Sequence, residues 1–125
     1  MSNSALELAN EGLAAWRRGD ADALEALFDP AATWRWFEPG DWDCENREDI
    51  VRTLKERYEQ GFAEGRMEVL EAGPDTVIAV SWPREIGGEE WPEETATVIS
   101  FRGGRVVSMQ DHRTRAEALA AVGER

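Results

Sequence analysis

The spacing of apolar residues changes near Met67, and this change limits the folds open to the chain. Before Met67, apolar side chains recur every three or four residues, as in Leu6, Ala9, Leu13 and Trp16. Such steps place side chains on one face of a helix. After Met67, apolar and polar residues mostly alternate, which is typical of strands. A helical first half followed by a strand-rich second half predicts an α+β domain.

Three helices are expected before this point and one after the strands. Ser4, Asp20 and Asn46 are suited to cap the first three, because their side-chain oxygens can accept bonds from first-turn N–H groups. A short strand is expected at residues 32–37, and further strands at 67–73, 76–82, 94–102 and 105–112. A short helix at 116–122 ends the pattern. The 125 residues fit a single domain, residues 1–125.

The last two strands form the clearest predicted hairpin, closed by Gly103-Gly104. Glycine supplies the positive φ that a two-residue turn requires. Counting residues outward from this turn predicts that Ala96 pairs with Asp111. It also predicts that one face of the hairpin carries Val98, Val107, Met109 and Asp111, and we expect this face to be concave. The other face is partly apolar too and needs a cover, for which a second subunit is suited. We expect a homodimer through that outer face, formed by Thr97, Ile99, Phe101, Val106, Ser108 and Gln110.

Net charge excludes several classes of partner. The chain has 14 Lys and Arg against 26 Asp and Glu, a net charge of −12. A surface of this sign repels phosphate backbones and anionic membranes, so neither nucleic acid nor a membrane is an expected partner. No apolar run is long enough for a membrane span, and the first ten residues lack a secretory signal pattern. We therefore expect a cytoplasmic protein.

Metal and thiol chemistry has few candidate residues. One cysteine, Cys44, and one histidine, His112, exclude an internal disulfide, a cysteine zinc cluster and a His-rich metal site. Asp41, Asp43 and Glu45 have the spacing that opens a calcium loop. However, the sixth and twelfth positions of that loop lack the required Gly and Glu. We expect neither a metal nor a cofactor.

Several short motifs, taken in order, resemble the SnoaL-like branch of the nuclear transport factor 2-like superfamily. They are Ala31-Ala32-Thr33-Trp34 after a Leu-Phe-Asp-Pro turn, the helix start Asn46-Arg47-Glu48-Asp49-Ile50, and the last strand Gly104-Arg105-Val106-Val107…Asp111. The resemblance extends from about residue 5 to residue 123. It implies a cone, in which a curved, mostly antiparallel sheet wraps around a long helix and encloses an apolar pocket. It also implies a homodimer formed through the outer face of the sheet.

Asp111 is the main candidate for a catalytic residue. In the polyketide cyclases that the chain resembles, an acid/base aspartate stands seven residues after the glycine that opens the last strand, and Asp111 has this spacing from Gly104. On an apolar face, desolvation raises the pKa of a carboxyl group, which suits it to proton transfer near neutrality. The alternative is a structural carboxylate that pairs with Arg113 or Arg115, or caps the last helix.

Aromatic residues supply the rest of the expected pocket. The residues expected to line it are Trp16, Trp34, Trp36, Tyr58, Val98, Val107 and Met109, and Trp42 and Trp91 are expected near its mouth. Simple core packing is the alternative for the lining aromatic residues, and exposed or dimer-buried indoles are the alternative for Trp42 and Trp91. Three functions stay open. One is cofactor-free acid/base catalysis of the isomerase, cyclase or dehydratase type on a small hydrophobic or aromatic molecule. The others are ligand binding without catalysis, and dimerisation without a cavity.

Overall fold

The computed structural model describes residues 4–38, 40, 43–82, 85–86, 89–90 and 93–123. Its first half contains α1 (Ala5–Arg17), α2 (Ala21–Leu27), β1 (Phe28–Arg35), α3 (Arg47–Glu59) and the 3₁₀ turn η1 (Phe62–Glu64). The second half contains β2 (Met67–Gly73), β3 (Thr76–Ser81), β4 (Glu85–Ile86), β5 (Glu89–Glu90), β6 (Thr95–Arg102), β7 (Arg105–His112) and α4 (Arg115–Gly123). The α+β fold class expected from the apolar spacing is confirmed.

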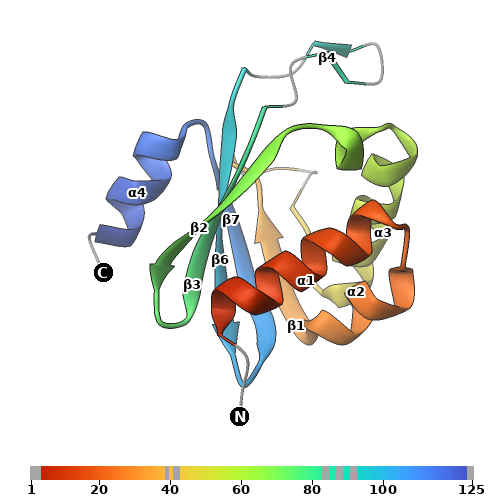
Figure 1. Cartoon of the computed structure of the whole chain (residues 1–125), viewed down its shortest axis with the longest axis horizontal. Coiled ribbons are helices and arrows are strands. Elements are labelled where there is room, and N and C mark those ends of the chain that lie inside the picture. The colour runs from red at the N-terminus through yellow and green to blue at the C-terminus, as the bar shows by residue number, and fades with distance from the viewer. Residues whose placement is uncertain are drawn as a thin grey trace.

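The main sheet has five strands in the order β1-β7-β6-β3-β2. β1 runs parallel to β7, and the other neighbours are antiparallel. Figure 1 shows α1 crossing the sheet, with α2 and α3 beside it and α4 on the other side of the strands. β4 and β5 pair with each other between the strands expected at 76–82 and 94–102.

Local sequence signals fix the helix ends as expected. The Ser4 hydroxyl accepts a bond from the backbone N–H of Glu7 (3.1 Å), and the Asn46 side chain accepts one from Asp49 (2.9 Å). Asp20 caps α2 in the same way through Ala23 (3.1 Å). These bonds satisfy first-turn N–H groups that a helix cannot bond internally.

β1 differs from the strand expected at residues 32–37, because it starts at Phe28 and ends at Arg35. α2 stops at Leu27, one residue before Phe28 pairs with Val106 of β7. The pairing is irregular between Phe28 and Thr33. Pro30 lies in this stretch and has no N–H to donate, so a strand containing it was not evident from the sequence.

A bulge in β7 changes which side chains share a face. Near the turn, the pairing agrees with the one predicted from Gly103-Gly104: Arg102 is opposite Arg105, and Phe101 is opposite Val106. The next pair is Ser100 with Ser108, so Val107 is an extra residue without a partner in the ladder. An inserted residue shifts every later pair by one. Asp111 is therefore opposite Thr97, and not opposite Ala96 as expected.

The bulge corrects the expected faces of the hairpin. Thr97, Ile99, Phe101 and Val106 line an apolar cavity between the sheet and the helices, so these four cannot contribute to a dimer through the outer face. The prediction that these four residues form a dimer interface is therefore wrong. Of the six residues expected there, Ser108 and Gln110 do not line the cavity. Dimerisation itself stays an expectation.

The outer face is partly covered by the chain itself. Ala118 of α4 is fully buried in a second apolar cluster with Ile78, Val80, Ala96 and Val98. Val98 therefore packs beneath α4 and does not line the cavity, which corrects its expected position. α4 therefore supplies part of the cover that was expected from a second subunit.

Candidate functional site

An apolar cavity of about 160 Å³ lies between the helices and the inner face of the sheet. α1, α2 and α3 contribute residues such as Leu13, Leu24 and Leu54, and the strands contribute alternate residues such as Val69, Ala79 and Ile99. A comparable apolar cavity of about 150 Å³ in another protein accepts benzene. The space is therefore large enough for a molecule with a single ring.

Asp111 is the acidic residue of the described cavity wall. It is 5% exposed, and its Oδ1 accepts hydrogen bonds from Trp34 Nε1 (2.9 Å) and Thr97 Oγ1 (2.7 Å). Both contacts end on Oδ1, and neither of them involves Oδ2.

Burial raises the pKa of Asp111 above its ordinary value, because a carboxylate loses its hydration in this apolar wall. The hydrogen bonds from Thr97 and Trp34 and the positive charge of Arg57 act in the opposite direction but do not cancel this effect. The result is a carboxyl group that can hold or release a proton closer to neutrality than an exposed aspartate.

Arg57 is the cation of α3 that lines the same cavity. Its Cζ lies 5.2 Å from the ring centroid of Trp34, 5.8 Å from that of Trp36 and 5.3 Å from that of Phe62. A guanidinium within about 6 Å of an aromatic face is attracted to it. Burial lowers the pKa of Arg57, and the negative charge of Asp111 raises it.

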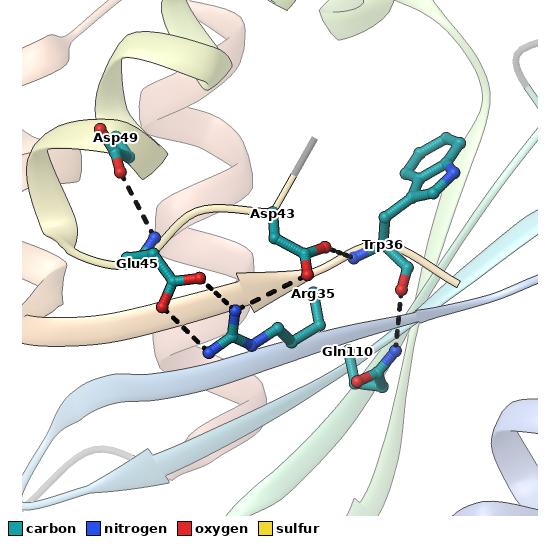
Figure 2. Close-up of polar contacts among 6 residues, drawn as sticks. All are labelled: Arg35, Trp36, Asp43, Glu45, Asp49 and Gln110. Carbon is teal, nitrogen blue, oxygen red and sulfur yellow. Dashed lines mark hydrogen bonds and ion pairs between the residues drawn. The ribbon is translucent and has the colours of Figure 1, made fainter. Parts of the chain in front are cut away.

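The backbone of Trp36 is held from two directions at the end of β1, as Figure 2 shows. Its N–H donates to Asp43 Oδ1 (2.8 Å), and its carbonyl accepts from Gln110 Nε2 (3.3 Å). Arg35 forms ion pairs with Asp43 (3.6 Å) and with Glu45. These contacts fix the segment from which the Trp36 indole enters the cavity wall.

Residues 43–45 also protect the edge of the sheet. Trp34 N–H donates to the Cys44 carbonyl (3.0 Å), and Cys44 N–H donates to the Trp34 carbonyl (2.8 Å). This isolated bridge holds Cys44 against β1. Cys44 is buried, and burial raises the pKa of its thiol. A thiol with a raised pKa is a poor nucleophile.

Hydroxyl groups continue the polar side of the cavity along the sheet. Ser81 and Thr95 are paired across β3 and β6, and their side-chain oxygens lie 2.8 Å apart. Thr97 follows two residues later on the same face and bonds to Asp111. The polar groups therefore gather at one end of the cavity, while Phe101 and Val106 line the other end.

The structure brings together five of the eight residues expected at the site. Trp16, Trp34, Trp36, Met109 and Asp111 all lie in the cavity wall. Trp16 also donates from Nε1 to the Leu54 carbonyl (2.8 Å), which ties α1 to α3. Trp42 and Trp91, expected at the mouth, lie outside the described residues.

Three expected pocket residues are elsewhere. Val98 faces α4, and Val107 is the bulged residue outside the cavity wall. Tyr58 is 41% exposed and lies beside the backbone of Gly19, where an added Cβ would be 3.1 Å from the phenol ring. The hairpin count assumed no bulge, and α3 places Arg57 in the cavity wall in place of the neighbouring Tyr58.

The sequence analysis missed five polar residues of the cavity wall, which are Arg57, Arg66, Ser81, Thr95 and Thr97. Arg57 lies seven residues after Ile50 and three after Leu54, so it belongs to the buried stripe of α3. A charged residue at a stripe position was the signal that could have found it. Thr97 had no comparable signal, because its face depends on the bulge at Val107.

Two further findings concern other kinds of site. In the part of the chain that the structure describes, no three His, Cys, Asp or Glu side chains gather as a metal-binding group. Asp41 of the calcium-like pattern lies outside that part. None of the described helices has the length and apolar character needed to cross a bilayer.

The curved sheet and the helices that close it around one apolar cavity define an α+β domain of the nuclear transport factor 2-like class. A family model described as a SnoaL-like domain matches residues 9–109. The chain belongs to this SnoaL-like family. The matched region ends before Asp111, so family membership does not by itself assign a role to that residue. No curated protein matches the chain.

Solved structures agree with the fold. Bal32a, from a soil-derived mobile gene cassette, has 26% identity and a TM-score of 0.66, with 86% of this chain and 87% of that chain covered. An NTF2-like protein of unknown function from Cytophaga hutchinsonii has 10% identity and a TM-score of 0.65, with 90% and 91% covered. A Sinorhizobium meliloti protein called a "putative polyketide cyclase" has 16% identity and a TM-score of 0.62, with 85% and 94% covered. The last two likenesses concern the fold alone.

Proposed function

We propose that the protein binds a small, single-ring apolar or aromatic molecule in its cavity and that Asp111 transfers a proton on it without a cofactor. The observation that carries this proposal is the placement of Asp111, which is 5% exposed in an apolar wall with both hydrogen bonds on one oxygen. The second oxygen is then the one that meets the ligand. A desolvated carboxyl group of this kind is a suitable general acid or base.

A second candidate is binding without turnover. Asp111 is the one carboxylate among the described residues of the cavity wall, and no histidine, lysine or tyrosine accompanies it there. Arginine stays protonated in proteins, so Arg57 does not serve as a second acid or base. A reaction in this cavity must therefore return the proton through Asp111 itself, as an isomerase does, or through water.

Deuterium exchange tests catalysis without knowledge of the natural substrate. Acetophenone carries one ring and acidic protons next to its carbonyl, and NMR in heavy water reports their loss. We expect the wild-type protein to accelerate the exchange, and Asp111→Asn to lower the acceleration about 100-fold or more. Asp75→Asn is the matched control, because Asp75 is exposed in the turn between β2 and β3. Equal exchange with wild type and Asp111→Asn would contradict catalysis, and binding without exchange would support the second candidate.

A further inference from the structure

Asp111 and Arg57 contact the same indole from two different elements. Trp34 donates its N–H to Asp111 Oδ1 at 2.9 Å, and its ring lies 5.2 Å from the guanidinium carbon of Arg57. Asp111 comes from β7 and Arg57 from α3, and both line the cavity. Trp34 thus holds an anion and a cation on the wall of one small apolar space.

The position of the cation is fixed by packing. Trp34, Trp36 and Phe62 each present a ring within 6 Å of the Arg57 guanidinium. A guanidinium is planar and carries five N–H donors, which match a carbonyl or carboxylate oxygen. Rings that hold the plane reduce the entropy lost when a ligand oxygen binds to it.

We infer that Arg57 binds the carbonyl oxygen of the substrate and stabilises the enolate that forms when Asp111 removes the neighbouring proton. The inference rests on the proposed function and names its substrate class, a single-ring compound with a C–H bond next to a carbonyl group. Arg57 is then a catalytic residue of the same site, and not only a structural cation.

The step is balanced in atoms and in charge. The Asp111 carboxylate takes the proton, the C–H electron pair becomes the new C=C bond, and the carbonyl π electrons move to oxygen. The protonated Asp111 returns the proton to the same carbon, or to a carbon further along the conjugated system, and this restores the carbonyl. No oxidant or reductant is consumed.

This arrangement avoids creating charge in an apolar space. Before the step, the negative charge is on Asp111, and after it the charge is on the enolate oxygen, while Arg57 stays positive. Charges fixed in advance where negative charge develops are an effective way to lower a reaction barrier. The other guanidinium of the cavity wall, Arg66, packs 4.2 Å from the Trp82 ring centroid, whereas Arg57 shares Trp34 with Asp111 and is the cation that we assign to the enolate oxygen.

A phenolate is a stable analogue of the enolate, since both carry the charge on an oxygen attached to an sp² carbon. Para-nitrophenol is a suitable probe because its visible spectrum separates the phenol from the phenolate. Asp111→Asn reproduces the uncharged state of Asp111 that accompanies the enolate. We expect this variant to bind para-nitrophenolate more tightly than the wild-type protein, whose Asp111 carboxylate repels it.

Arg57 is then tested in the Asp111→Asn background. We expect the added change Arg57→Gln to weaken phenolate binding about 10- to 100-fold, as for a lost hydrogen bond to a charged group. Arg57→Lys keeps the charge and should restore part of the affinity. Arg52→Gln is the matched control, because Arg52 lies on the same helix, is 66% exposed and pairs with Asp49 at the surface.

Anisole separates this inference from the proposed function, because it has the same ring and no ionisable group. If anisole binds and the Arg57 substitutions leave phenolate affinity unchanged, the role of Arg57 is overturned while the cavity stays a binding site. If neither anisole nor phenolate binds to any folded variant, both proposals fail. Circular dichroism and melting curves verify that each variant is folded.

Discussion

The indole N–H of Trp34 donates a 2.9 Å hydrogen bond to Oδ1 of Asp111, although the two residues are 77 positions apart in the chain. The parallel pairing of β1 with β7 makes this contact possible, because Trp34 lies next to Met109 on the inner face of the sheet. The bond ends on Oδ1, and the proposed function assigns Oδ2 to the ligand. Most of what we expect of the site depends on this pair.

Asp111 is expected to make stability depend on pH. Burial raises its pKa in the folded protein, so at pH values between the unfolded and folded pKa the folded state holds a proton that the unfolded chain releases. The free energy of unfolding therefore falls as pH rises through this interval and stays reduced above it. Asp111→Asn removes this dependence, so the variant should gain stability relative to wild type as pH rises. Urea unfolding at a series of pH values measures the difference.

The control for this prediction is Asp75→Asn, which changes an exposed aspartate. It should keep the pH profile of the wild-type protein. Parallel profiles for wild type and Asp111→Asn would mean that Asp111 is not desolvated in solution.

Trp34→Phe removes the N–H bond to Asp111 and keeps a ring for Arg57 to pack against. We expect a loss of about 1–3 kcal/mol in the free energy of unfolding, as for a buried acceptor that loses a donor. Because this bond lowers the pKa of Asp111, its loss should raise that pKa further. Carbon NMR titration of the Asp111 carboxyl group measures the shift. Trp82→Phe, at another indole of the cavity wall, should leave the pKa of Asp111 unchanged.

Val98 and Ile99 are neighbours in β6 that face opposite sides of the sheet. Val98 packs under α4, and Ile99 lines the cavity. Val98→Ala and Ile99→Ala should each cost about 1–3 kcal/mol of stability. Only Ile99→Ala should enlarge the cavity and strengthen the binding of larger single-ring compounds, such as propylbenzene compared with benzene. An effect of Val98→Ala on this preference would contradict the observed faces.

Ala118→Asp should detach α4 from the sheet. Ala118 is fully buried, and an unpaired charge at this position is strongly unfavourable. Because α4 is the last described helix, it can separate while the rest of the fold stays intact. Hydrogen exchange should then become faster in α4 and in the strands beneath it, but not in α1. Leu119→Asp is the control, since Leu119 is 46% exposed, and equal effects of the two changes would contradict the packing of α4.

Local signals made much of the fold predictable. The caps at Ser4, Asp20 and Asn46 act within one helical turn, and the glycines of the β6–β7 turn have the positive φ values of 60° and 81° that such a turn requires. These features depend on residues close in sequence, so they can be predicted without knowledge of the tertiary structure. The start of β1 was less predictable, because Phe28 becomes part of a strand only by pairing with β7.

The site was predictable in part. Asp111, Met109 and Trp34 were placed in the cavity wall by strand alternation and by the family resemblance, and the structure places them there. The bulge decides on which face of the sheet Val98 and Thr97 lie, and no local sequence signal predicted this bulge. Arg57 was not considered for the pocket, because only apolar and aromatic residues of its helix were, whereas three aromatic rings pack against its guanidinium.

The extra residue at Val107 also bears on how relatives should be compared. The final strands of two homologues can align without gaps and still present different side chains to the interior. This happens if only one of them has a bulge at the position of Val107. Conservation of an acidic residue at a fixed distance from the turn is then an incomplete criterion for shared chemistry. The pairing register of the last two strands therefore has to be established for each family member before its activity is inferred from that of a relative.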